Sequence, residues 1–170
     1  HHNIVVSGWF ARWYDLFLKY RSEICDLFKI DERYTSVVKG KMERAETGCK
    51  DIIRLGVHMR RGDYAVWKNG IYCYDNNTYI SYISRFATLV SGKQIHVYLS
   101  TNDPDVTADY FQMALPEVKV HLLAGSPPED LSMLSECDYI MGPPSTFSLV
   151  AAMYRDIPLC RMDTTDADNL

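Results

Sequence analysis

The sequence of 170 residues lacks several features that would assign a protein to a class at once. No apolar stretch approaches the length of a transmembrane helix, and no basic-then-apolar start resembles a signal peptide. The formal net charge of −4 gives no support to a general nucleic-acid or membrane-surface binder. The glycine-rich fingerprints G-x-G-x-x-G and G-x-x-x-x-G-K-[ST] are absent, so neither a dinucleotide site nor a P-loop is indicated.

The sequence also has few cysteines. The five are Cys25, Cys49, Cys73, Cys137 and Cys160, an odd number at wide spacings without a C-x-x-C pair. This pattern fits neither a disulfide framework nor a zinc site. We interpret the cysteines as buried or incidental thiols of a protein in a reducing, cytoplasmic compartment.

Length and composition are those of an ordinary globular domain, or of one domain with a piece of another. Hydrophobic residues make up 47% and charged residues 24% of the chain. An unusually aromatic amphipathic pattern from Phe10 to Leu27 predicts a helix, and its early start suggests that part of a larger protein is missing. Residues 31–50 are polar and fit either a linker or a helix crossing between domains. We therefore divide the chain into a helical segment with linker, 1–48, and a second domain, 49–170.

From Ile52 onward, strand and helix patterns alternate. The expected strands are 52–58, 95–99, 118–122, 138–141 and 158–162, and the expected helices are 79–90, 105–115, 129–137 and 146–154. Thr78 is expected to cap the first of these helices. The alternation predicts an α/β fold with a parallel sheet and helices on both faces. The long connection 62–77 is expected to be a functional loop.

Polar segments follow three of the predicted strands. Ligands of such sheets bind outside the carboxyl ends of the strands, which brings 58–63, 100–103 and 142–148 to one crevice. Arginine presents a rigid fork of donors that fits phosphate oxygens, and Arg60 and Arg61 stand at such an end. Ser145 or Thr146 would cap the next helix, where free N–H groups make a phosphate site. A cap without a ligand is the alternative for Ser145 alone. Together these segments predict a sugar-nucleotide site.

The same segments resemble a known family. Residues 58–63, His-Met-Arg-Arg-Gly-Asp, resemble the H-x-R-R-x-D motif of the α1,2-fucosyltransferases, and residues 98–104 are similar to the motif that follows it. Residues 130–138, continuing to 145–148, look like the third motif of this superfamily. The resemblance covers about residues 50 to 163. The segment Gly8-Trp9-Phe10 resembles the helix that precedes the first motif in bacterial α1,2 enzymes.

The resemblance implies a GT-B fold whose C-terminal, Rossmann-like half binds GDP-fucose, with the N-terminal half largely absent from this chain. It also implies a donor site assembled from the three motifs. Arg60 would contact the β-phosphate, and Asp103 would lie near the nucleoside. Arg61 would bind the donor or anchor the loop. The remaining implied donor-binding residues are His58 and Asp130 at the guanosine and Ser145, Thr146, Phe147 and Ser148 at the phosphates.

The implied reaction is an inverting, metal-independent transfer of fucose to a glycan acceptor. Negative charge builds on the departing β-phosphate, and Arg60 would stabilise it in place of a metal, so no metal and no cofactor are expected. Asp63 either acts in catalysis or braces Arg60 or Arg61. The alternatives are a catalytically silent GDP-sugar-binding module and a transferase that uses another nucleotide sugar. A cytoplasmic enzyme of this kind would be peripheral to a membrane where its acceptor is lipid-linked.

Overall fold

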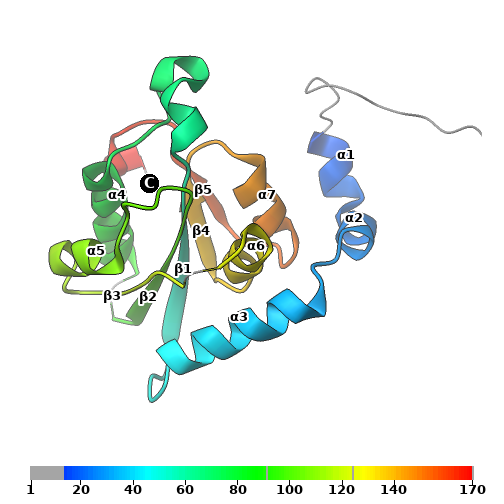
Figure 1. Cartoon of the computed structure of the whole chain (residues 1–170), viewed down its shortest axis with the longest axis horizontal. Helices are drawn as coiled ribbons and strands as arrows, with labels where there is room; N and C mark the ends of the chain where they lie inside the picture. Colours follow the sequence, from blue (N-terminus) through cyan, green and yellow to red (C-terminus); the bar gives the residue numbers. More distant parts are fainter. Residues whose placement is uncertain (1–13, 91, 124, 170) are drawn as a thin grey trace, which may run out of the picture.

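A five-stranded parallel sheet forms the centre of the molecule (Figure 1). The computed structural model describes residues 14–90, 92–123 and 125–169. The strands are β1 Ile52–Met59, β2 Gln94–Thr101, β3 Lys119–His121, β4 Tyr139–Gly142 and β5 Leu159–Arg161. Their order is β3-β2-β1-β4-β5, and every neighbouring pair is parallel. The predicted α/β fold with a Rossmann-like parallel sheet is confirmed.

Helices cover both faces of the sheet (Figure 1). The helices α4 Asn76–Leu89 and α5 Ala108–Ala114 lie on one face, next to the 3₁₀ turn η3 Ala167–Asn169. The helices α3 Glu32–Ala45, α6 Pro127–Ser135 and α7 Thr146–Met153 lie on the other. Each face has its own hydrophobic core. Because β1 lies between β2 and β4, the polar segment after β1 stands at the centre of the sheet, at the carboxyl ends of its strands.

The polar segment after residue 30 forms a helix, as one of the two interpretations of residues 31–50 expected, while its crossing between domains stays a prediction. The Asp31 side chain accepts a hydrogen bond from the Arg33 N–H and caps α3. Val38 and Met42 are buried in the same core as α6, and Lys41 pairs with Glu129 at 3.1 Å. The helix α3 therefore packs on the sheet domain, while the division of the chain at residue 48 stays a prediction.

The predicted helix from Phe10 to Leu27 is interrupted. The helix α1 spans Tyr14–Lys19 and α2 spans Arg21–Leu27, with Tyr20 between them in a non-helical conformation. Residues 10–13, and the segment Gly8-Trp9-Phe10, lie outside the described residues.

Two helices, α4 and α6, begin earlier than the sequence predicts, because other residues cap them. The carboxylate of Asp75 accepts the backbone N–H of Thr78 at 2.8 Å, so Asp75 caps α4 and the expected cap at Thr78 is wrong. Thr78 instead occupies the third helical position, where an N–H needs an acceptor. The helix α6 begins two residues early because Ser126 and Glu129 form a reciprocal pair, with the Ser126 N–H donating to Glu129 Oε2 at 2.7 Å.

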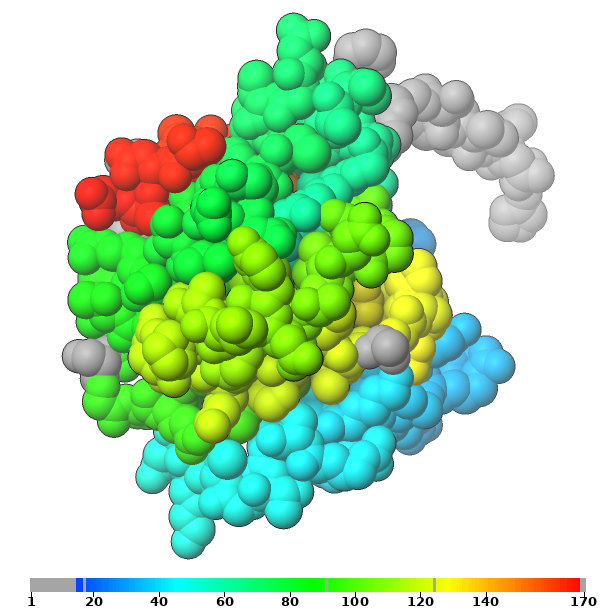
Figure 2. Space-filling view, turned by 60° about the vertical axis from the view of Figure 1, so that its left-hand side comes forward, coloured from blue at the N-terminus to red at the C-terminus, as the bar shows by residue number. Residues whose placement is uncertain are grey.

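The long connection after β1 is partly ordered into two turns, η1 Gly62–Ala65 and η2 Trp67–Gly70. The backbone of Lys68 and Asn69 is left-handed, with φ of 48° and 58°. Figure 2 shows this blue-green segment projecting at one end of the molecule, with the cyan α3 at the opposite end. The connection therefore rises above the carboxyl ends of the strands, where the sequence predicts a site.

Candidate functional site: a cationic cleft at the sheet edge

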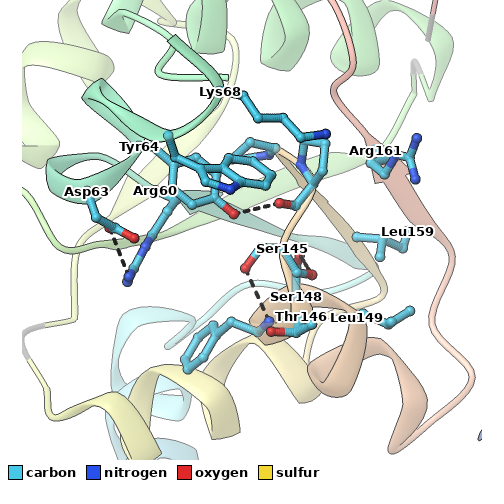
Figure 3. Close-up of a pocket in the computed structure, with 14 residues that line it drawn as sticks. Arg60, Asp63, Tyr64, Lys68, Ser145, Thr146, Ser148, Leu149, Leu159 and Arg161 are labelled. Atoms are coloured by element: carbon cyan, nitrogen blue, oxygen red, sulfur yellow. Dashed lines mark hydrogen bonds and ion pairs between the residues drawn. The ribbon is translucent and has the colours of Figure 1, made fainter. Parts of the chain in front are cut away.

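A cleft with a volume of about 920 Å³ opens at the carboxyl ends of β1, β4 and β5 (Figure 3). Its size lies in the range of small-molecule sites, which is about 300–1,000 Å³. Three segments line it: the connection after β1 (Arg60, Asp63, Tyr64, Trp67, Lys68), the turn into α7 (Pro143, Pro144, Ser145, Thr146, Phe147, Ser148, Leu149) and β5 (Leu159, Arg161). The structure thus brings most of the third predicted segment together with Arg60 and Asp63 of the first.

The floor of the cleft includes the beginning of α7. Ser145 is the N-cap, and its Oγ accepts the backbone N–H of Phe147 at 3.2 Å. Ser148 is buried and its hydroxyl donates to the Ser145 carbonyl at 3.2 Å. Thr146 is exposed at the cleft. The predicted cap at Ser145 is confirmed, and because that oxygen acts as an acceptor, its hydroxyl proton can still be donated to a ligand.

A glycine allows the turn into α7 to reach the end of β1. A Cβ on Gly142 would lie 2.6 Å from the carbonyl oxygen of His58, a distance that real Cβ atoms do not adopt. Tyr64 then ties the two segments together, because its hydroxyl donates to the Pro144 carbonyl at 2.6 Å. These contacts hold Arg60 and Ser145 on the same cleft.

Arg60 and Asp63 form an ion pair inside the cleft, with 2.9 Å between Arg60 Nη2 and Asp63 Oδ1. The guanidinium also lies 5.8 Å from the centroid of the Tyr64 ring. Its side chain is 39% exposed, so the group is accessible to a ligand. These contacts fit the interpretation in which Asp63 braces Arg60.

Positive charge dominates the residues that line the cleft. Three of them are cationic, Arg60, Lys68 and Arg161, and one is a carboxylate, Asp63. The whole chain carries a formal charge of −4, so this local excess runs against the overall charge. A cleft with this balance attracts an anion.

Arg61 and Asp103 do not line the cleft. Arg61 Nη1 contacts Asp103 Oδ2 at 2.8 Å, Arg61 Nη2 donates to Asn76, and the Arg61 N–H donates to Asn102 Oδ1 at 2.7 Å. The Asp105 N–H and the Arg61 guanidinium hold the pKa of Asp103 below its usual range. These contacts tie the ends of β1 and β2 to the start of α4, and they fit the alternative in which Arg61 anchors the loop.

His58 lies behind the cleft and is buried. Its ring centroid is 5.1 Å from that of Phe147, which does line the cleft. Burial, with the nearby Arg60 charge, lowers the pKa of His58 to about 4. Its Nδ1 has no hydrogen-bond partner among the described residues, which is rare for a buried polar atom, so this nitrogen is open to a hydrogen bond from a ligand or a water molecule.

Asp130, on α6, is connected to the strand that neighbours His58. Its Oδ2 accepts the hydroxyl of Ser100 at 3.0 Å, and Ser100 pairs with His58 in the sheet register. Burial raises the pKa of Asp130 to about 6. Asp130 does not line the cleft, and its contact with Ser100 places it beside the end of β2.

Lys68 and Arg161 are the charged cleft residues that the sequence interpretation missed. Arg161 is the last residue of β5, so the rule on carboxyl ends of strands points to it. Lys68 lies in the long connection 62–77. Only the length of this connection indicated a function, and no pattern singled out Lys68 within it.

Among the described residues, no group of three or more histidine, cysteine or acidic side chains could hold a metal ion. Asp-x-Asp spacings, which bind metal in many transferases, occur at 103–105 and 166–168. Neither spacing contributes to the cleft lining, and Asp103 is paired with Arg61. The expected independence of metal stays a prediction.

Comparisons with known proteins connect the fold to solved structures. No family model matches the sequence, and a search of curated proteins found no match. The structure is similar to POFUT1 in complex with GDP-fucose, with a TM-score of 0.62 and 18% identity over 77% of this chain and 46% of that chain. It is also similar to POFUT1 in complex with GDP, with a TM-score of 0.59, 19% identity and the same coverage.

The fold is therefore shared with these POFUT1 structures over the matched part, and the predicted GT-B-type, Rossmann-like fold is confirmed. The chain spans about half the length of the POFUT1 structures that it matches. Within the described ranges, no helix is both long and apolar enough to cross a bilayer.

Proposed function

We propose that the cleft binds GDP-fucose and that the protein transfers fucose from it to a glycan acceptor. The observation that supports this most is the balance of three cations and one carboxylate around the start of a helix. A nucleoside diphosphate brings the negative charge that such a cleft attracts. The likeness in fold to POFUT1 in complex with GDP and with GDP-fucose supports guanosine diphosphate as the nucleotide.

In this proposal the β-phosphate lies between Arg60 and the start of α7. Arg60 presents its guanidinium to the phosphate oxygens, and Ser145 and Thr146 donate hydroxyl or backbone hydrogens. The guanosine lies toward Phe147, with the unpartnered Nδ1 of His58 and the carboxylate of Asp130 behind it. Ser148 supports this binding indirectly, because its hydroxyl contacts the Ser145 carbonyl.

The proposed reaction is an inverting, metal-independent transfer, and by the motif resemblance it forms an α1,2 linkage as bacterial α1,2 enzymes do. As the bond to the anomeric carbon breaks, charge develops on the departing β-phosphate. Arg60, held by Asp63 and by the Tyr64 ring, is already in place to stabilise that charge. Asp63 acts through Arg60 here, and the base that takes the acceptor proton is not assigned.

A second function is a catalytically silent module that binds a GDP-sugar. Among the described residues that line the cleft, none is assigned as the base that takes the acceptor proton, which such a module does not need. For either function, five free cysteines support a reducing, cytoplasmic compartment. Transfer activity with a glycan acceptor separates the enzyme from the module.

The first test is Arg60→Ala, measured by calorimetric titration with GDP. We expect a loss of about 1.5–3 kcal/mol in binding free energy, as for removal of a charge-assisted hydrogen bond. The matched control is Arg33→Ala, which removes an arginine that is 80% exposed on α3 and pairs with Asp31. Arg60→Ala with unchanged GDP affinity would contradict the proposal, as would an equal loss in Arg33→Ala.

A further inference from the structure

The cleft holds a cation that its proposed donor does not use, Lys68. In Figure 3, Lys68 and Arg161 lie on one side of the cleft and Arg60 and Asp63 on the other, with Ser145 and Thr146 below. The cleft thus has two cationic sides. The proposed function assigns the diphosphate to the side of Arg60.

The Lys68 ammonium lies over two rings, Trp67 and Tyr72, of a row of three neighbouring aromatic side chains. The centroids of Tyr64 and Trp67 are 4.7 Å apart, and those of Trp67 and Tyr72 are 5.5 Å apart. Lys68 Nζ lies 5.1 Å from the Trp67 centroid and 5.6 Å from the Tyr72 centroid. Cation–π contacts of this kind hold the charge in place without neutralising it.

The backbone at this point is strained. Lys68 and Asn69 are consecutive non-glycine residues with left-handed φ, and Gly70 follows with φ of 77°. The turn is also tight, since a Cβ on Gly70 would lie 2.9 Å from the Ala65 carbonyl. Such strain persists only where the surrounding structure enforces it, and it is concentrated at functional sites. Here its effect is to turn Lys68 into the cleft.

Lys68 also differs from the other two cations in its partners. Arg60 pairs with Asp63, and Arg161 Nε contacts both carboxylate oxygens of Asp163 at 3.0 Å. Within the part of the chain that the structure describes, no carboxylate forms an ion pair with Lys68. Its charge remains available to a ligand.

We propose that Lys68 and Arg161 form a second anion subsite, which binds the negatively charged group of an acidic acceptor sugar. This inference rests on the proposed function, in which Arg60 binds the diphosphate of the donor. A carboxylate or a phosphate ester on the acceptor would meet the two cations. Leu149 and Leu159 line the same cleft and offer apolar surface to the sugar ring.

The test is a titration of the GDP-saturated chain with glucuronic acid, glucose 6-phosphate and neutral glucose. The readout is the NMR signal of the Trp67 indole N–H, which is assigned by its loss in Trp67→Phe. We expect one or both acidic sugars to shift this signal and glucose not to shift it. The two acids separate a carboxylate-binding from a phosphate-binding subsite.

Variants at Lys68 link the binding to its charge. Lys68→Gln keeps a polar side chain of similar length and removes its charge. This variant is expected to weaken the binding of the acidic sugar by about tenfold, or about 1.4 kcal/mol. Lys68→Arg is expected to retain binding, and Arg161→Gln to weaken it in a second, independent variant. Lys93→Gln is the control, because Lys93 is exposed just before β2, at the amino ends of the strands and so away from the cleft. Thermal melts establish that each variant is folded.

Several results would overturn the subsite. These are no shift with either acidic sugar, equal affinity in Lys68→Gln, or a loss of GDP affinity in Lys68→Gln as large as that in Arg60→Ala. The last result would assign Lys68 to the diphosphate. A wild-type chain that does not bind GDP contradicts the proposed function instead, and the same titration without GDP then tests the anion subsite by itself.

Discussion

The ionisation of Asp130 makes a quantitative prediction about the donor site. Burial raises its pKa to about 6 in the free protein. If the carboxylate accepts hydrogen bonds from the guanine, only its ionised form binds the donor. At pH 5 about one-tenth of the molecules carry that form, so the affinity for GDP-fucose is expected to be about tenfold lower at pH 5 than at pH 7.5.

The same shift has a consequence for stability. A carboxyl whose pKa is raised in the folded state stabilises the fold below its ordinary pKa of about 3.9, and this contribution is lost as the pH rises through about 6. The shift of about two units sets an upper bound of about 3 kcal/mol, and solvent screening of the partly exposed carboxyl lowers the actual contribution. Donor binding would compensate for the ionised carboxylate at neutral pH.

The assay is calorimetric titration with GDP-fucose between pH 5 and 7.5, on the wild type and on Asp130→Asn. GDP-fucose is used because its diphosphate has no group that titrates in this range. His58 does not interfere, because its pKa of about 4 keeps it neutral. We expect the pH dependence to disappear in Asp130→Asn. A flat wild-type profile, or the same slope in the variant, would refute the role of Asp130 at the guanine.

Three further predictions follow from the site. His58→Asn is expected to gain about 3 kcal/mol of stability relative to the wild type as the pH falls from 6.5 to about 4, because only the wild type has a buried imidazole whose pKa is lowered to about 4. The readout is the difference between the two proteins in urea unfolding, in which the opposite contribution of Asp130 cancels; a difference that does not change with pH would contradict this. Arg61→Ala is expected to reduce stability by about 1–3 kcal/mol while GDP affinity changes little, since its contacts anchor the loop; the opposite pattern would place Arg61 at the donor. GDP affinity in excess EDTA is expected to equal that in buffer, and recovery of a lost affinity on adding Mn²⁺ would show that a metal is required.

The parallel sheet was predictable because strand patterns and helix patterns alternate along the sequence at regular spacing. The rule that ligands bind at carboxyl ends of strands then located Arg60, Ser145 and Thr146 on one cleft without any knowledge of side-chain contacts. The cap at Ser145 was predictable because a serine oxygen can accept a free backbone N–H at a helix start.

Other features depended on contacts that the sequence does not reveal. The cap of α4 is Asp75 because its carboxylate reaches the Thr78 N–H, and a sequence pattern allows either residue. The left-handed backbone of Lys68 goes against the usual preference of lysine, so no local pattern predicts that Lys68 faces the cleft. Arg61 and Arg60 are neighbours in sequence, and their environments differ through contacts that the sequence does not show: Arg61 pairs with Asp103, whereas Arg60 pairs with Asp63.

Calorimetric titration of this chain with GDP, with UDP and CMP as controls, tests the central claim most directly. The account predicts selective binding of GDP, and a gain of about 2.7 kcal/mol in stability when GDP is at a hundred times its dissociation constant. Equal binding of the three nucleotides, or no binding of any, would contradict a guanosine diphosphate site in the cleft between Arg60 and α7.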